Sequence, residues 1–217
     1  MEPKPLVLQH PVTAELRAAG VVDACDAVDA TVVEWLTVLS RRDVALVIWI
    51  RTPDDDEPAQ VLLARFAQWW VALERCADLI RISGAGIATA EGAASMVVSR
   101  QVERLCGQND PAPLRPVTLD ADQMRLLTLA ADPSQSAQAS IVATQSGVET
   151  GRIHRMHVGS SAVTIIDTPD GRLVAEDVES GGKTWMIIAP GSGSNIAAGI
   201  NRMMRRLPAR EGWHSYR

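Results

Sequence analysis

The chain has 217 residues, of which 47% are hydrophobic and 22% are charged, proportions typical of a soluble globular protein with a hydrophobic core. Its net charge of -5, without an obviously basic face, argues against nucleic acid as a partner. No apolar run approaches the roughly 20 residues of a membrane span, and the first residues lack a signal-peptide pattern. We therefore expect a cytoplasmic protein without a membrane span. Three widely spaced cysteines predict neither a disulfide framework nor a zinc site.

Two helices are predicted at the start of the chain. Pro11 opens a short helix that runs to about Ala18. Asp29 is placed to cap a second helix, in which apolar residues recur at i, i+3, i+4 and i+7. These residues are Val32, Trp35, Leu36 and Leu39. We expect this stripe to face the hydrophobic core.

The pattern then changes to that of strands. The segments Val44–Thr52 and Val61–Glu74 are apolar and rich in β-branched or aromatic residues, and they predict two strands joined by an acidic loop. A third strand is predicted from Asp78. The segment Ser95–Gly107 predicts either the end of a strand or a helix that ends at its glycine.

The second half shows a similar order of elements. A helix is predicted over residues 118–133, with Asp120 and Gln123 at capping-box spacing. Strands follow, and a Pro-Asp-Gly turn at 169–171 joins two stretches into a hairpin. The chain then predicts a final helix from about Ser194. The buried face of this helix is expected to carry Ile196, Ile200, Met203 and Leu207.

The fold class follows from the connections between the strands. Short connections favour antiparallel pairing, because a parallel pair needs a crossover of a dozen or more residues. The chain therefore predicts an α+β fold rather than a doubly wound α/β fold. We expect one domain, residues 1–217, whose halves 1–110 and 111–217 are related by an internal duplication.

The glycine-rich turn in Ala189–Gly199 lies between a predicted strand and a helix, where proteins often bind phosphate. Its glycines do not fit the dinucleotide fingerprint, because Ile196 stands where the third glycine is required. The lysine of an ATPase phosphate loop is missing as well. Ser192 or Ser194 is instead predicted to cap the final helix, and we expect no cofactor.

No other motif predicts catalysis or metal binding. His154 and His157 are three residues apart on a predicted strand, so their side chains point to opposite faces and cannot bind one metal ion together. The acidic loop Pro53–Pro58 lacks the spacing of a calcium loop. We expect a solvated hairpin tip or, if the loop is functional, a protein-docking element.

Two adjacent tryptophans, Trp69 and Trp70, stand on a predicted strand. Because successive side chains of a strand alternate, one indole must face each side of the sheet. We expect helices to bury both faces. The alternative is that one indole lies on an exposed binding surface.

Blocks of sequence spread over most of the chain resemble the EspG family, cytosolic chaperones associated with mycobacterial type VII (ESX) secretion. Near the C-terminus these blocks are "IIDT" before Gly171, "PG" at 190–191, and "LP" followed by Trp213. Upstream blocks such as "HPVTAELRAAGVVD" and "FAQWWVALER" are similar to the paralogue of the second ESX locus. The family carries additional helical sequence near positions 122–123 and a strand and helix before the "HPV" helix, segments that we expect this chain to lack.

The resemblance implies a central antiparallel sheet with flanking helical bundles and two pseudo-symmetric halves. It implies a chaperone, not an enzyme, that binds PE-PPE heterodimers, covers the hydrophobic tip of the PPE protein and directs the pair to its secretion system. By position in the family, the partner-binding residues fall in two places. One is the acidic loop of the first half, and the other is the helix predicted over residues 118–133. They are Thr52, Pro53, Asp54, Asp55, Asp56 and Glu57, and then Met124, Leu126 and Leu127.

Two other functions remain open from the sequence. One is a small-molecule or nucleotide-binding enzyme, and the other is a plain homodimeric scaffold. We expect the free protein to be a monomer or a weak homodimer.

Overall fold

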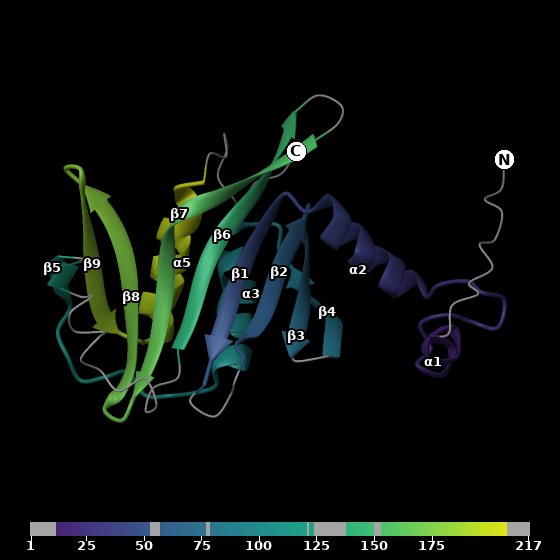
Figure 1. Ribbon diagram of the computed structural model, residues 1–217, viewed down its shortest axis with the longest axis horizontal. Helices are drawn as coiled ribbons and strands as arrows, with labels where there is room; N and C mark the ends of the chain where they lie inside the picture. The colour runs from purple at the N-terminus through teal and green to yellow at the C-terminus, as the bar shows by residue number, and fades with distance from the viewer. Residues whose placement is uncertain are drawn as a thin grey trace.

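The computed structural model describes residues 12–52, 57–76, 79–120, 122–123, 138–149 and 153–207. Within these ranges, one sheet of nine antiparallel strands has the order β4-β3-β2-β1-β6-β7-β8-β9-β5 (Figure 1). The α+β class and the central antiparallel sheet are confirmed.

Each helix has a recognisable start or end in the sequence. The described helices are α1 (Thr13–Ala18), α2 (Ala30–Arg41), α3 (Glu91–Cys106) and α5 (Gly193–Arg205). The Asp29 carboxylate caps α2 by accepting hydrogen bonds from two backbone N–H groups. Ser192 caps α5 by accepting from the N–H of Asn195. Gly107 ends α3 at φ 69°, a conformation that favours glycine. The predicted N-caps of α2 and α5 are confirmed.

The strands form two meanders that meet in the middle of the sheet. The first meander is β1 (Val44–Arg51), β2 (Ala59–Phe66), β3 (Trp69–Cys76) and β4 (Leu79–Ile87). The second is β6 (Gln138–Glu149), β7 (Ile153–Thr168), β8 (Gly171–Ser180) and β9 (Lys183–Pro190), and β5 (Val117–Asp120) lies outside β9. The predicted hairpin at the Pro-Asp-Gly turn joins β7 to β8.

Two predicted elements are wrong. The segment Val61–Glu74 is not one strand, because a two-residue turn with Ala67 at φ 53° divides it into β2 and β3. The helix predicted over 118–133 is wrong at its start, where Thr118 to Asp120 belong to strand β5 and pair with β9. In both places tertiary pairing decides what a local apolar pattern leaves open. The rest of that helix, from position 124, lies outside the described residues.

The main core lies between the sheet and two helices that cover one of its faces. The helices α3 and α5 contact one another and lie behind the sheet in Figure 1. Strands of both meanders supply core residues to this face, among them Leu46, Leu63, Trp70, Ile141 and Ile165. The predicted buried face of α5 is confirmed, since Ile196, Ile200, Met203 and Leu207 are all buried.

Helix α2 packs on the opposite face over a row of small side chains. Ala45, Ala64, Val71 and Gly84 are paired across β1 to β4. A Cβ atom on Gly84 would lie 3.3 Å from Nε1 of Trp35, so the glycine allows the helix to approach. The predicted core stripe of α2 is wrong in part, because Leu36 is 46% exposed and its neighbour Val38 is buried.

Two pairs of elements in the two halves start at the same sequence interval, which also separates two buried glutamates. Glu74 on β3 and Glu176 on β8 are both buried, and each is paired with an arginine of the helix behind its own half, Arg104 or Arg202. The same interval separates the first residue of β3 from that of β8, and the first residue of α3 from that of α5. We therefore propose that residues 1–110 and 111–217 are an internal duplication within one domain.

A buried arginine joins the second meander to the end of α3. Arg172 on β8 is 4% exposed, and its Nε donates to Oδ1 of Asp167 at 2.6 Å. Its terminal nitrogens donate to the carbonyl oxygens of Cys106 at 2.7 Å and Gly107 at 2.8 Å. The hydrogen bond to Asp167 raises the pKa of Arg172, and the guanidinium satisfies carbonyls that the end of a helix leaves without partners.

The backbone of Arg172 fixes two further segments. Its N–H donates to Asp110, and its carbonyl accepts from the N–H groups of Ala112 and Gly191. A Cβ atom on Gly191 would lie 2.2 Å from Cγ of Arg172, and one on Gly171 would lie 2.7 Å from the carbonyl oxygen of Asp110. The two glycines therefore allow the loop after α3 and the start of α5 to meet at this residue.

Replacing Arg172 by methionine should lower the free energy of unfolding by about 3 kcal/mol, because the change leaves the Asp167 carboxylate and two helix carbonyls without their donor. Urea denaturation of the purified protein measures this change. The control is Arg100→Met, at an exposed position on α3, which should change stability by less than about 0.5 kcal/mol. Equal stability of the two variants would contradict the role given to Arg172.

Candidate functional site

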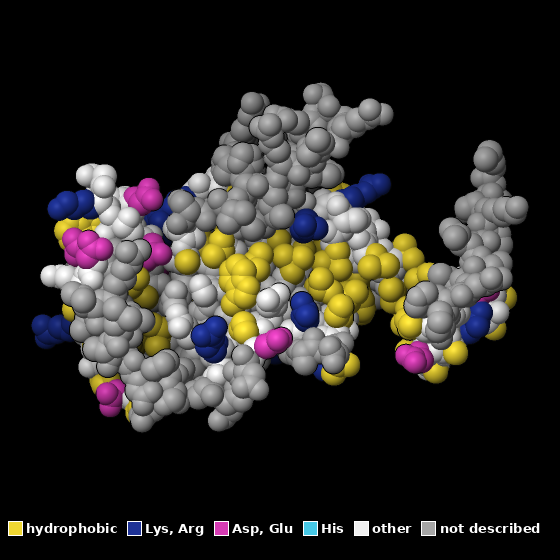
Figure 2. Space-filling view, viewed as in Figure 1, with side chains coloured by type: hydrophobic (Ala, Val, Ile, Leu, Met, Phe, Trp, Pro, Cys, Tyr) yellow, Lys and Arg dark blue, Asp and Glu magenta, His cyan; other side chains and the backbone are white. Residues whose placement is uncertain are grey.

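The sheet face opposite α3 and α5 carries a row of apolar side chains that remain partly exposed. We call it the apolar row; its members are Ile82, Leu73, Leu62, Val47, Val142 and Ala162, on β4, β3, β2, β1, β6 and β7. Each residue is paired with the next across the sheet. Figure 2 shows apolar side chains running across the middle of this face.

The apolar row follows from the alternation of side chains along β1. Leu46 and Ile48 point to the face covered by α3 and α5, so Val47 and Trp49 point to the other face. Helix α2 contacts β2, β3 and β4 on that face, over the row of small residues that begins at Ala45. A contiguous apolar surface left open to water is typical of a site that binds another molecule.

Trp49 extends the apolar surface toward the acidic loop. Its side chain is 37% exposed, and it pairs with Gln60 on β2 and Ser140 on β6. Thr52, at the end of β1, is half-buried, and Glu57, before β2, is exposed. The strand end therefore places a large aromatic side chain close to the predicted docking loop, a combination suited to a protein interface.

Most of the predicted site residues lie outside the described residues. Pro53, Asp54, Asp55 and Asp56 in the loop are among them, as are Met124, Leu126 and Leu127. Trp49 was not among the predicted site residues, although the alternation in "VALVIWIRT" already placed it on the opposite face from Leu46 and Ile48.

The two adjacent tryptophans lie on opposite faces, as predicted. Trp70 is 1% exposed in the core, whereas Trp69 is 44% exposed. The expectation that helices bury both faces is therefore wrong at Trp69. An apolar groove of about 550 Å³ runs between α2 and the β3-β4 hairpin, and Val33 and Ile87 also line it.

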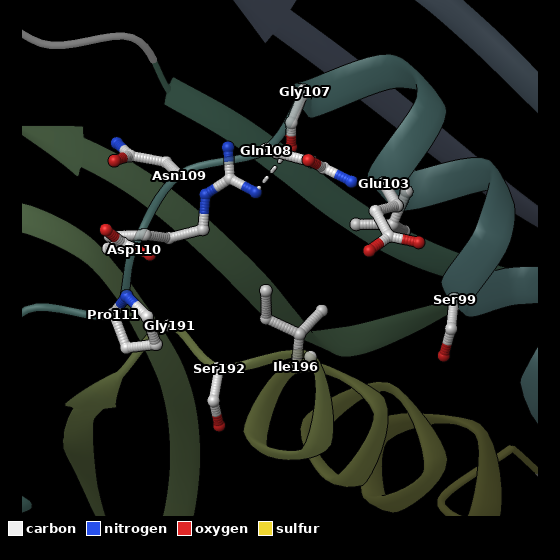
Figure 3. A pocket seen from close by; sticks show the side chains of 13 residues that line it. Ser99, Glu103, Gly107, Gln108, Asn109, Asp110, Pro111, Gly191, Ser192 and Ile196 are labelled. Atoms are coloured by element: carbon white, nitrogen blue, oxygen red, sulfur yellow. Dashed lines mark hydrogen bonds between the residues drawn. The ribbon is translucent and has the colours of Figure 1, made fainter.

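The glycine-rich turn before α5 borders a polar pocket of about 640 Å³ (Figure 3). Ser192 and Gly193 line it at the start of the helix, and Glu103 and Asp110 line it from α3 and the following loop. Arg172 also lines it, but this guanidinium is already paired with a carboxylate. The two acidic side chains would repel a phosphate group, so the helix start is explained by its cap.

The described residues offer little for catalysis or metal binding. No group of three His, Cys, Asp or Glu residues within the described ranges could hold a metal ion. Cys106 is a free thiol at the end of α3, and burial raises its pKa to about 11 although Arg172 acts in the opposite direction. A thiol with such a pKa is a poor nucleophile at neutral pH. None of the helices in the described part is long and apolar enough to cross a membrane.

Comparison with known proteins identifies the family of this chain. The sequence model of the EspG family matches residues 5–202. The chain belongs to the EspG family. The ESX-2 secretion-associated protein EspG2 of Mycobacterium tuberculosis is 44% identical over 234 residues, which cover 97% of this chain and 84% of that protein.

Two further EspG proteins are more distant. The ESX-1 secretion-associated protein EspG1 of M. tuberculosis is 25% identical over 94% of this chain and 75% of that protein. The solved structure of M. tuberculosis EspG5, a type VII secretion system chaperone in complex with a PE25-PPE41 dimer, has a TM-score of 0.71. It is 19% identical and covers 96% of this chain and 88% of that one, so it establishes the shared EspG fold.

Alkylation should separate Cys25 from Cys106 in this EspG protein. At pH 8 a thiol with a pKa of about 11 is about one part in a thousand thiolate, so Cys106 should react with iodoacetamide at least tenfold more slowly than exposed Cys25. Because the thiolate fraction rises about tenfold per pH unit below the pKa, raising the pH from 8 to 10 should increase the reaction rate of Cys106 by about a hundredfold. Peptide mass spectrometry measures both rates, with circular dichroism to verify folding. Equal rates at pH 8 would contradict the burial of Cys106.

Proposed function

We propose that this chain is a cytoplasmic chaperone that binds a PE-PPE heterodimer and directs it to a type VII secretion system. Membership of the EspG family supports this function, and so does the shared fold with EspG5, which was solved with a PE25-PPE41 dimer. The partner of this chain would be a heterodimer of the same class.

The observation that carries the proposal is the open apolar row with Trp49 beside it on β1. Protein interfaces gain most of their binding energy from a few buried aromatic and apolar residues near the centre. The apolar row and Trp49 would provide that centre, because they are already gathered on one face in the unbound protein. Covering them and an apolar tip of the partner at once removes both surfaces from water.

The acidic loop would act at the rim of the interface. Asp54, Asp55, Asp56 and Glu57 place four carboxylates in consecutive positions beyond the end of β1. Charges at the rim of an interface contribute mainly to the rate of association and to specificity. Met124, Leu126 and Leu127 stay in the proposal as apolar contacts from the second half of the chain. The proposal includes no catalytic step, cofactor or metal.

Co-expression with PE-PPE pairs encoded in the same secretion locus tests the proposed function. One pair should co-purify with this protein and elute with it as a single complex in size-exclusion chromatography. The same runs give the state of the free protein, for which we propose a monomer or a weak homodimer. Failure of every pair from that locus to co-elute would refute the chaperone function.

Replacing Trp49 by alanine should weaken binding of the PE-PPE pair by about tenfold or more, because a large aromatic anchor would be lost from the centre of the interface. The matched control is Trp69→Ala, which removes another half-exposed indole, on β3 beside α2. Isothermal titration calorimetry measures both affinities. An equal loss in the two variants would show that Trp49 has no special part in binding.

Changing Asp54, Asp55 and Asp56 together to lysine should slow association of the PE-PPE pair without lowering the melting temperature by more than a few degrees. The change reverses rim charges that a solvated loop presents to the partner. Surface plasmon resonance at low and high salt measures the effect, which should shrink as salt screens the charges. An unchanged association rate at low salt would remove this loop from the proposed interface.

A further inference from the structure

The two outer edges of the sheet differ. The outer edge of β9 is paired with β5, whereas the outer edge of β4 is paired with no strand in the described part of the chain. Leu79 and Ile80 on β4 are 77% and 69% exposed. An open edge presents unpaired backbone N–H and C=O groups, and proteins usually protect such edges with prolines or several charges. Strand β4 has no proline, and Arg81 is its single charged residue.

The internal correspondence shows which part of β4 matches the covered part of β9. The equivalent buried glutamates set the alignment: Glu74 pairs with Arg81, and Glu176 pairs with Ile187. Strand β5 pairs with the segment Trp185–Ile188 of β9. Because Arg81 and Ile187 pair with the equivalent glutamates, they occupy equivalent positions. The segment of β4 that corresponds to Trp185–Ile188 is therefore Leu79–Ile82. This segment includes the two most exposed large apolar side chains of the described residues.

The sequence of β5 gives the chemistry of the segment that such an edge accepts. Val117 and Leu119 point to one face of the sheet, and Thr118 and Asp120 point to the other. A segment bound to β4 in the same register would place its two apolar side chains opposite Ile82 and Ile80. Its threonine would lie opposite Arg81, and its carboxylate would lie diagonal to the same guanidinium, within reach of a long side chain.

We propose that the outer edge of β4 binds an extended segment of a partner protein as an additional antiparallel strand. The segment has two apolar residues that contact Ile80 and Ile82, and between or beside them it has a carboxylate that pairs with Arg81. Backbone hydrogen bonds provide affinity in this mode of recognition, and the alternating side chains provide specificity.

The charge of Arg81 favours such a segment over a second copy of the chain. Two β4 edges paired about a two-fold axis that is normal to the sheet and passes near Arg81 would bring both Arg81 side chains together on the same face of one ladder. Like charges close together across a strand pair are destabilising. A segment that carries a carboxylate gains from the same arginine.

A peptide with the sequence of β5 is the probe for this edge. We would titrate the nonapeptide RPVTLDADQ, residues 115–123 of the chain, into the isotopically labelled full chain and follow backbone amides by NMR. The amides of Leu79–Ile82 should shift and exchange more slowly with solvent, whereas a scrambled peptide should leave them unchanged. Equal effects of the two peptides, or shifts confined to other strands, would overturn the proposal.

A charge swap tests the role of Arg81. The variant Arg81→Glu should weaken binding of the nonapeptide by about threefold to tenfold, because an exposed attraction becomes a repulsion. A peptide with lysine in place of Asp120 should regain that loss with the variant. The control Arg100→Glu reverses a charge at an exposed position of α3 and should leave the affinity unchanged. Unchanged affinity in Arg81→Glu, or amide shifts on β4 that depend on protein concentration without peptide, would overturn the proposal.

Discussion

A buried arginine holds the two halves of the molecule together. Arg172 pairs with Asp167 within the second meander and donates to the last carbonyls of α3, which belongs to the first half. The end of a helix needs donors and a buried guanidinium needs acceptors, so each satisfies the other. The backbone of the same residue also binds the loop after α3 and the start of α5. Two helices and two strands are therefore positioned by one side chain and its own peptide groups.

This arrangement commits one face of the sheet to the core and leaves the other partly open to water. With α3 and α5 fixed behind the sheet, the residues that point forward along β1 cannot be covered by them. Helix α2 covers the forward face where Ala45, Ala64 and Gly84 leave room for it. The apolar row and Trp49 lie beyond that region and stay partly exposed. A chaperone for an apolar partner needs such a surface, held in place by a rigid sheet.

The two halves share a framework but differ at their outer edges of the sheet. Both bury a glutamate on their third strand and pair it with an arginine from a helix. The second half covers its outer edge with β5, while the first half leaves Leu79 and Ile80 of β4 exposed. The open face and the open edge meet at Ile82, which belongs to the apolar row and also to the segment of β4 proposed to bind a strand.

Elements whose signals are local could be predicted from the sequence. Asp29 and Ser192 stand before amphipathic runs, and their side chains cap α2 and α5, because a cap needs only its own helix. The turn at Gly171 and the antiparallel α+β class were predicted for the same reason, since short connections limit how strands can pair. The buried face of α5 followed from its helical period. The ordered blocks of family-like sequence indicated the EspG family.

Which apolar side chains are exposed to water depends on how the elements pack in the folded chain. Leu36 and Trp69 sit in patterns typical of core residues, yet both are exposed, because burial depends on which helix covers which part of the sheet. Trp49 lay in an ordinary strand pattern, and its place beside the open apolar row follows from the pairing of β1 with β2 and β6. The pairing of β5 with β9, and the bare edge of β4, join residues far apart in the chain. Local periodicity carries no information about such partners, so the folded sheet alone fixes them.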